Sequence, residues 1–262
     1  MYNKQKTGIA LAGGGAKGAY QIGALKALLE LNINYDYVAG TSIGALNAAA
    51  YVLKDYEKYS LRWSNMDFSY KNENYKQLNI SKFKLSEILN NIEEFEREYL
   101  NTEGINPEEV INMLKNVIDE DSVRDSKINL GITTYCLTDK KPLNLFIEDI
   151  PIGMLPEFIF ASCNLPVFTP RLINGKHYLD GGVFNSLPVN MLIEKGCKTI
   201  ITIRLKNEFY DFSKYGNIKI IDIAPDEFLS ETLSADQERI KWMINKGYED
   251  AIKILKENIN DL

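Results

Sequence analysis

Two glycine-rich turns, each between a strand-like and a helix-like segment, constrain the fold of this chain more than any other feature. The first turn follows the apolar run Thr7–Leu11 and opens a helical pattern over Ala19–Leu31. The second follows the apolar run Tyr35–Ala39 and opens an alanine-rich helical segment over Ala45–Leu53. Strands and helices that alternate in this way favour an α/β fold with a mainly parallel sheet.

The segment from about residue 54 to residue 127 differs from what precedes it, because it is rich in Glu, Asn and Lys. Helical patterns lie near Ser86–Tyr99 and over Pro107–Ile118, and Asn106 is typical of an N-cap before a first-turn proline. We expect a helical insert over the C-terminal edge of the sheet, within a single α/β/α domain of residues 1–262. Strands are then expected over Ile128–Tyr135, Leu143–Ile147, Thr199–Leu205 and Ile218–Ile223, and a final helical segment over Asp226–Asn258.

The composition excludes several classes of function. The chain has 30 Lys and Arg against 36 Asp and Glu, and its net charge of −6 argues against a nucleic-acid binder or a strongly polybasic membrane anchor. A single histidine excludes sites that need two imidazoles, such as HExxH zinc sites. The cysteines, Cys136, Cys163 and Cys197, are odd in number and widely spaced, which excludes a CxxC metal site and a disulfide framework.

The sequence contains no recognisable targeting segment. No run approaches the roughly 18 apolar residues of a spanning helix. The N-terminal apolar run Gly8–Ala12 is five residues long, shorter than the roughly 7–15 residues of a signal peptide. We therefore expect a cytoplasmic protein.

The second turn, residues 40–44, fits the nucleophile-elbow pattern G-x-S-x-G. A serine at a sharp strand-to-helix turn has its hydroxyl exposed at a helix N-terminus, where an oxyanion is stabilised. Its neighbours must be small for the chain to fold back so tightly. A glycine-rich turn with an exposed serine is the structural alternative. The motif residues are Gly40, Thr41, Ser42, Ile43 and Gly44.

The first turn offers backbone N–H groups that can converge on one point, as an oxyanion hole requires. It also matches the dinucleotide pattern G-x-G-x-x-G, so a nucleotide-binding oxidoreductase is an alternative. That alternative needs an acidic residue at the end of the second strand, but the candidate Asp36 stands near the beginning of its strand. A P-loop is excluded because the lysine is followed by glycine. The turn comprises Gly13, Gly14, Gly15, Ala16, Lys17 and Gly18.

A third motif, Asp180-Gly181-Gly182, follows the short strand-like run Lys176–Leu179. An aspartate at such a bend can direct its carboxylate into a site, although the same residues also suit a plain turn.

The three motifs in this order resemble the patatin-like phospholipase family. The resemblance extends to the block Ala161–Pro166 and to the segment Val183–Val189, and covers roughly residues 6 to 205. It implies a three-layer α/β/α patatin-like fold with a mainly parallel central sheet and a helical insert.

The resemblance also implies a Ser–Asp dyad, with Ser42 as the nucleophile and Asp180 as its base. The N–H groups of Gly14, Gly15 and Ala16 would hold the oxyanion. The implied substrates are lipid esters, met in transient contact with a membrane surface, and no metal or organic cofactor is implied. A catalytically silent lipid-binding protein with the same fold is a further alternative.

The competing site is a triad of Ser42, His177 and an acid, in the chain order of α/β-hydrolases. Against it, His177 precedes Asp180 by three residues of a strand-like run, so their side chains point to opposite faces. We expect His177 to be structural or exposed.

Overall fold

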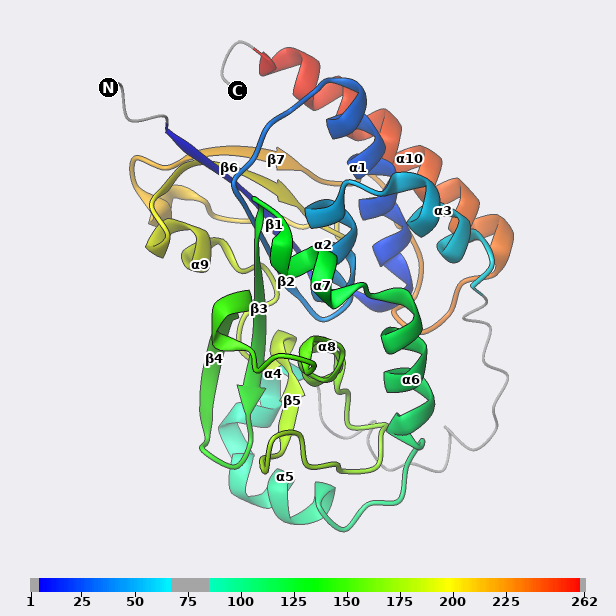
Figure 1. Ribbon diagram of the computed structural model, residues 1–262, viewed down its shortest axis with the longest axis vertical. Coiled ribbons are helices and arrows are strands. Elements are labelled where there is room, and N and C mark those ends of the chain that lie inside the picture. The colour runs from blue at the N-terminus through cyan, green and yellow to red at the C-terminus, as the bar shows by residue number, and fades with distance from the viewer. Residues whose placement is uncertain (1–4, 67–84, 260–262) are drawn as a thin grey trace.

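A seven-stranded sheet forms the centre of the computed structural model, which describes residues 5–66 and 85–259 (Figure 1). Its strand order is β4-β3-β2-β1-β6-β7, and β5 pairs with β3 beyond the end of β2. The strands are β1 (Lys6–Leu11), β2 (Tyr37–Thr41), β3 (Asn129–Cys136), β4 (Lys141–Phe146), β5 (Tyr178–Asp180), β6 (Cys197–Ile203) and β7 (Lys219–Ile223).

Five strands, β3, β2, β1, β6 and β7, run parallel to one another, whereas β4 and β5 run antiparallel to β3. The central strand β1 is buried from Thr7 to Leu11, as expected for a parallel strand covered on both faces. The predicted α/β fold with a mainly parallel sheet is therefore confirmed. The carboxyl ends of the parallel strands share one edge, where the two glycine-rich turns lie.

Strands β2 and β5 lie end to end on the same side of β3. Strand β2 pairs with β3 as far as Thr41 opposite Thr133, and β5 takes over at the next residue, with Asp180 opposite Thr134. The other side of β3 is occupied by β4 over this stretch. Because β2 is parallel to β3 and β5 is antiparallel, their carboxyl ends meet. Ser42, the residue after β2, is thereby brought beside Asp180.

Helices cover both faces of the sheet (Figure 1), which confirms the three-layer architecture. A Cβ atom on Gly8 of β1 would lie 3.0 Å from Leu192 of α9, whereas one on Gly40 of β2 would meet the Gly44 carbonyl of α2. These two helices therefore cover opposite faces. One layer contains α1 (Ala19–Glu30), α2 (Ile43–Leu53), α8 (Leu155–Cys163) and α10 (Gln237–Glu257), and the other contains α9 (Val189–Glu194).

The described part of the predicted insert is helical. Helix α6 begins as its sequence predicts, since the Asn106 side chain accepts a hydrogen bond from Glu108 N–H and Pro107 occupies the first turn. Residues 67–84 of the insert lie outside the described residues. The insert helices are α3 (Tyr56–Ser64), α4 (Leu85–Ile88), α5 (Ile92–Tyr99), α6 (Pro107–Val117) and α7 (Glu120–Asp125).

Helices α4 and α5 pack against the carboxyl-terminal parts of β3 and β5. The helix predicted over Ser86–Tyr99 is interrupted here, because Leu89–Asn91 form a 3-10 turn between them. The packing places the insert next to the chain on both sides of Asp180. The buried cluster that joins them consists of Ile88, Phe95, Tyr99, Tyr135, Leu137, Leu179 and Val183.

The last predicted helix is wrong at its beginning. Helix α10 starts at Gln237 instead of Asp226, because the Asp236 side chain caps it by accepting a hydrogen bond from Arg239 N–H. Residues 226–236 form a loop in which Glu231 and Ser234 pair across a tight turn. This β7–α10 loop lies against the first glycine-rich turn.

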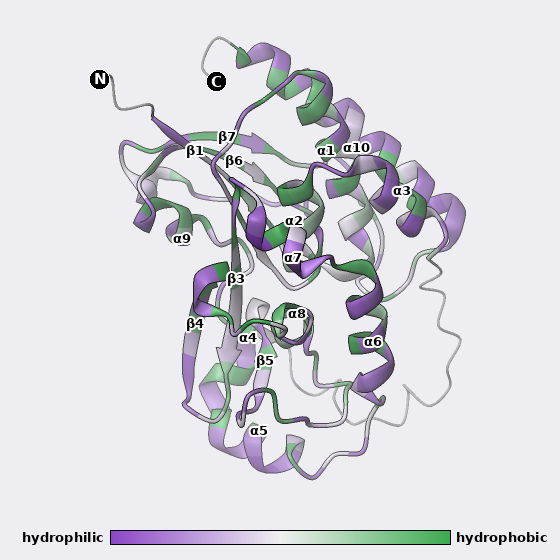
Figure 2. Cartoon of the chain, in the orientation of Figure 1, coloured by the Kyte–Doolittle hydropathy of each residue, from purple (hydrophilic) through white to green (hydrophobic). Residues whose placement is uncertain are grey.

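The hydropathy of the helices follows their position. Helix α2 is mainly hydrophobic and buried, whereas α3 is mainly hydrophilic and buries Tyr59 and Trp63 (Figure 2).

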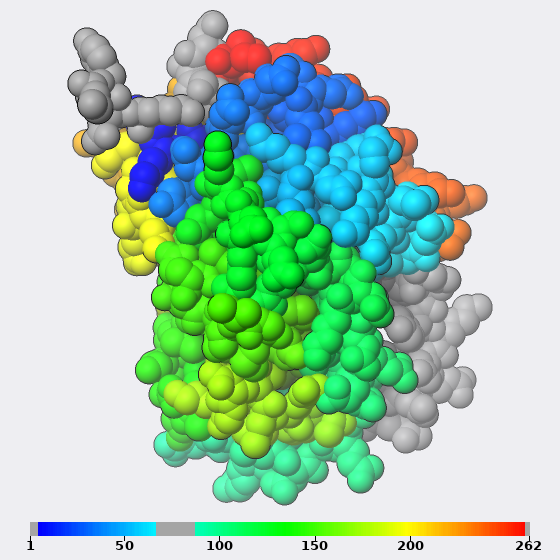
Figure 3. Space-filling view, in the orientation of Figure 1, coloured from blue at the N-terminus to red at the C-terminus, as the bar shows by residue number. Residues whose placement is uncertain are grey.

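In the space-filling view, the blue N-terminal part and the red C-terminal helix lie together, above the green middle of the chain (Figure 3). None of the helices within residues 5–66 and 85–259 is long and apolar enough to cross a membrane.

Helices α1 and α10 cross so closely that each needs a glycine. A Cβ on Gly23 would lie 1.8 Å from the Ile244 carbonyl oxygen, and one on Gly247 would lie 1.9 Å from the Tyr20 carbonyl oxygen. Helix propensity alone favours alanine by about 1 kcal/mol. We nevertheless expect Gly23→Ala to lower the free energy of unfolding in urea by about 2 kcal/mol. The exposed Asn245→Ala is the control, and wild-type stability of Gly23→Ala would contradict the close crossing.

Candidate active site

Ser42 occupies a strained turn between β2 and α2. Its φ of 56° and ψ of −127° lie in a region that residues with a Cβ rarely adopt. The turn can be this tight because glycines stand two residues before and two residues after Ser42. A Cβ on Gly40 would lie 2.1 Å from the Gly44 carbonyl oxygen, and one on Gly44 would lie 2.4 Å from the Leu11 carbonyl oxygen. This packing is the physical reason for glycine at both ends of the motif.

Asp180 lies directly beside Ser42. The Ser42 hydroxyl donates a hydrogen bond of 2.5 Å to Asp180 Oδ2, and Gly182 N–H donates one of 2.7 Å to Oδ1. Gly181 allows the chain to turn here, since a Cβ at this residue would lie 2.2 Å from the Thr133 carbonyl oxygen. The motif Asp180-Gly181-Gly182 therefore directs its carboxylate at the serine instead of forming a plain surface turn.

The Asp180 carboxyl group is buried, with 2% of the residue exposed. Burial raises its pKa to about 6, although the hydrogen bonds from Ser42 and Gly182 act in the opposite direction. A carboxylate with a raised pKa is a stronger proton acceptor than a solvated one.

The C-terminal end of α8 holds both members of this pair in place. The buried Ser162 hydroxyl accepts a hydrogen bond of 2.8 Å from Ser42 N–H and donates one of 2.6 Å to the Thr133 carbonyl. The Asn164 carbonyl accepts a hydrogen bond of 2.9 Å from Asp180 N–H. Ser162 and Asn164 both lie in the block Ala161–Pro166, whose sequence predicted no individual roles for them. A serine within the apolar run of α8 was the available signal.

Cys163, between these two residues, is close enough to the pair to interact with it electrostatically. Burial raises the pKa of its thiol well above the usual value, and the Asp180 carboxylate adds to the shift. The thiol is therefore neutral near pH 7, a form in which cysteine is a poor nucleophile.

The first glycine-rich turn lies against Ser42. A Cβ on Gly13 would lie 3.2 Å from the Cβ of Ser42. Gly15 has a φ of 60°, and a Cβ there would lie 2.0 Å from the Thr232 carbonyl oxygen. Glycine is thus required at this position by both backbone conformation and space.

The N–H groups of this turn differ in what they bind. Gly13 N–H donates to the Ser186 carbonyl over 2.9 Å, and Ala16 N–H donates to the Thr232 carbonyl over 2.8 Å. The N–H groups of Gly14 and Gly15 have no hydrogen-bond partner in residues 5–66 and 85–259. Of the three expected oxyanion donors, Gly14 and Gly15 are therefore available, and Ala16 is engaged.

The remaining motif residues support these turns. Lys17 is 6% exposed, and its ammonium group donates a hydrogen bond to the Thr232 hydroxyl of the β7–α10 loop. Burial is the main cause that lowers the pKa of this ammonium group. Gly18 packs closely against Ile43. The Thr41 hydroxyl donates to the Asn185 carbonyl over 2.9 Å, which ties β2 to the chain after Asp180.

The catalytic-triad alternative depends on His177 and the nucleotide-binding alternative on Asp36, and both residues lie away from Ser42 and the first glycine-rich turn. His177 hydrogen-bonds through its backbone to Leu137 and Thr138, at the end of β5 remote from Asp180. Asp36 accepts a hydrogen bond from Thr7 N–H at the amino-terminal edge of the sheet, opposite the glycine-rich turns. Neither side chain can serve a triad with Ser42 or hold a ribose at the first turn.

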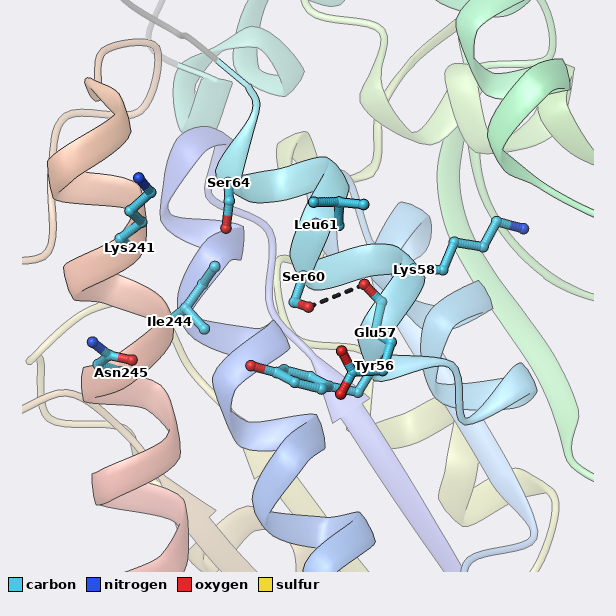
Figure 4. Close-up of a pocket in the computed structure, with 9 residues that line it drawn as sticks. All are labelled: Tyr56, Glu57, Lys58, Ser60, Leu61, Ser64, Lys241, Ile244 and Asn245. Atoms are coloured by element: carbon cyan, nitrogen blue, oxygen red, sulfur yellow. Dashed lines mark hydrogen bonds between the residues drawn. The ribbon is translucent and has the colours of Figure 1, made fainter.

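An open cavity of about 650 Å³ lies between α3 and α10 (Figure 4). None of the motif residues lines it. In the described part of the chain, no group of three His, Cys, Asp or Glu side chains could hold a metal ion. The cavity is lined by Tyr56, Glu57, Lys58, Ser60, Leu61, Ser64, Lys241, Ile244 and Asn245.

Comparison with known proteins finds several relatives. The lysophospholipase NTE1 of Kluyveromyces lactis is 27% identical over 202 residues, which are 76% of this chain and 12% of that protein. The patatin-like phospholipase domain-containing protein 7 of Rattus norvegicus is 25% identical over 80% of this chain and 14% of its own length. The chain thus spans only a small part of these two relatives. The probable lipid hydrolase 463L of Invertebrate iridescent virus 6 is 24% identical, over 96% of this chain and 89% of its own.

The fold is shared with a solved structure. VipD of Legionella pneumophila superposes with a TM-score of 0.54 and 14% sequence identity, over 97% of this chain and 67% of that one. The family model described as patatin-like phospholipase matches residues 9–193, which include both glycine-rich turns and the Asp-Gly-Gly motif. The chain therefore belongs to the patatin-like phospholipase family.

Proposed function

We propose that this protein is a serine acyl hydrolase that cleaves carboxylic esters of lipids, of the phospholipase A or lysophospholipase kind. The observation that carries the proposal is the hydrogen bond of 2.5 Å from the Ser42 hydroxyl to the buried Asp180 carboxylate. Relatives named as lysophospholipases and as a lipid hydrolase support lipid esters as the substrate class. We further propose that it acts in the cytoplasm, in transient contact with membrane surfaces.

The proposed reaction has two steps. Asp180 takes the Ser42 proton as Oγ attacks the ester carbonyl carbon, and the N–H groups of Gly14 and Gly15 stabilise the oxyanion. The tetrahedral intermediate then expels the alcohol, which receives the proton from Asp180, and leaves an acyl group on Ser42. Water, deprotonated by Asp180, attacks this acyl-enzyme, and the fatty acid leaves as Ser42 regains its proton.

The difficulty of this chemistry is that a carboxylate is a weak base. A free aspartate has a pKa of about 3.9, far below that of a serine hydroxyl. Burial raises the Asp180 pKa to about 6, which makes the carboxylate a better acceptor while leaving it ionised at neutral pH. The strained Ser42 backbone and the adjacent glycine-rich turn supply the positioning that the reaction also needs.

A fluorophosphonate tests the proposal without assuming a substrate. We expect one covalent adduct by intact mass on the wild-type protein and none on Ser42→Ala. Hydrolysis of a lysophospholipid should be lost in the same variant. An adduct on both proteins would show that another residue is the nucleophile. Absence of both adduct and hydrolysis in the wild type would favour a catalytically silent protein.

The buried Asp180 carboxylate also predicts a dependence of stability on pH. Its pKa of about 6 in the folded state exceeds the unfolded value of about 3.9, so ionisation destabilises the fold as pH rises through this range. Asp180→Asn removes this cost, and we expect it to raise the free energy of unfolding by about 2–3 kcal/mol at pH 8 and by little at pH 4. Urea denaturation at both pH values measures this. An equal effect at both would mean that the carboxyl pKa is not raised.

Ser162 should matter for catalysis because it holds Ser42 N–H. We expect Ser162→Ala to lower kcat at least tenfold and to destabilise the fold by about 1–3 kcal/mol. Ser126 is a matched control, since its hydroxyl also bridges two backbone groups, Val52 C=O and Ile128 N–H, away from the site. Ser126→Ala should lose stability and keep kcat, as measured by ester hydrolysis and urea denaturation. Equal kcat in the two variants would refute a role of Ser162 at the site.

A further inference from the structure

The β7–α10 loop contacts the first glycine-rich turn at three consecutive residues through Thr232. The Thr232 carbonyl oxygen lies 2.0 Å from where a Cβ of Gly15 would be, and it accepts a hydrogen bond of 2.8 Å from Ala16 N–H. The Thr232 hydroxyl accepts one of 3.0 Å from Lys17 Nζ. Thr232, in the loop before α10, thus holds the first glycine-rich turn by packing, by a backbone hydrogen bond and by a side-chain hydrogen bond.

The loop that carries the exposed Thr232 is anchored just before this residue. Its turn is closed by the pairing of Glu231 with Ser234. Arg239, in the first turn of α10, donates hydrogen bonds to the carbonyls of Phe228 and Leu229. Leu229 is 1% exposed, so its side chain anchors the loop in the core. The contact with the glycine-rich turn is therefore made by a loop that begins at a residue anchored in the core.

The hydroxyl of Thr232 has a specific partner in the Lys17 ammonium group. Lys17 is buried, and no carboxylate in residues 5–66 and 85–259 lies within ion-pair distance of it. A buried ammonium that loses its hydrogen bond must move toward water. The Cε atom of Lys17 lies 3.1 Å from where a Cβ of Gly14 would be, so the Lys17 side chain packs beside Gly14 and a change in its position alters the packing of that glycine.

From these contacts we propose that Thr232 is a positioning residue for the oxyanion hole. By engaging Ala16 N–H and Lys17, it holds the turn in the conformation that leaves Gly14 and Gly15 N–H free to face the ester oxygen. The inference rests on the proposed function. Thr232 lies outside residues 9–193, which the family model matches, so the family match does not assign it.

The test compares Thr232→Val, which removes the hydroxyl and keeps the shape, with Thr232→Ser, which keeps the hydroxyl. Ser234→Ala removes the exposed hydroxyl at the other end of the same turn and serves as the control. Two measurements are made on each protein. The first gives kcat and KM on the water-soluble ester 4-nitrophenyl butyrate, and the second gives the amide hydrogen exchange of the peptide that contains residues 13–18.

We expect Thr232→Val to lower kcat about tenfold with KM changed less than about twofold, because the oxyanion donors act mainly in the transition state. Exchange in residues 13–18 should become faster. Thr232→Ser should restore both quantities, and Ser234→Ala should change neither.

Wild-type kcat and wild-type exchange in Thr232→Val would overturn the positioning role while leaving the proposed function intact. A fall in kcat that Thr232→Ser does not restore would also overturn it. A wild-type protein that hydrolyses no ester and forms no fluorophosphonate adduct would overturn the proposed function, and the catalytic role of Thr232 with it.

Discussion

The meeting of two strand ends beside β3 is the constraint on which the rest of the site depends. Ser42 and Asp180 are 138 residues apart in sequence, yet a single register on β3 places one directly after the other. This arrangement requires one antiparallel strand, β5, within a mainly parallel sheet. If β5 were shifted by one residue along β3, the carboxylate would point to the other face of the sheet.

The site combines several features, each of which by itself destabilises the folded state. Ser42 has a strained backbone, and Asp180 and Lys17 are buried ionisable groups without an ion-pair partner in the described part of the chain. Each is held by hydrogen bonds: Ser42 N–H donates to the Ser162 hydroxyl, Gly182 N–H donates to the Asp180 carboxylate, and the Lys17 ammonium group donates to a loop hydroxyl. These hydrogen bonds and the close packing of the glycine-rich turns hold the groups in one arrangement. A site organised in advance in this way is what electrostatic stabilisation of an oxyanion requires.

Much of the fold could be predicted because its signals are local. The apolar strands, the helix after each glycine-rich turn and the Asn106 cap of α6 all depend on residues a few positions apart. The beginning of α10 was predicted too early, although its Asp236 cap is also a local signal. Leu229 and Leu233 stand at helical spacing, but tertiary packing buries the first and leaves the second exposed in a loop.

The residues that support the site, Ser162 and Thr232, could not be predicted because they are far in sequence from the residues they contact. Ser162 lies 120 residues from Ser42, and Thr232 lies 215 residues from Lys17, so no local pattern connects them. The expected use of Ala16 N–H as an oxyanion donor could not be checked without knowing that the Thr232 carbonyl binds it. Motifs thus pointed to Ser42 and Asp180, which the fold brings together, and the long-range contacts that surround them became visible only in the folded chain.

The central claim is that the ionised Asp180 carboxylate activates Ser42, and the pH dependence of Ser42 phosphonylation tests it most directly. The account predicts that the rate constant of fluorophosphonate labelling rises with a midpoint near pH 6 and then levels off, because the reaction needs the ionised form. In Asp180→Asn it should fall by about 100-fold or more and lose this midpoint. Labelling of Asp180→Asn at the wild-type rate, or with the same midpoint, would contradict the account.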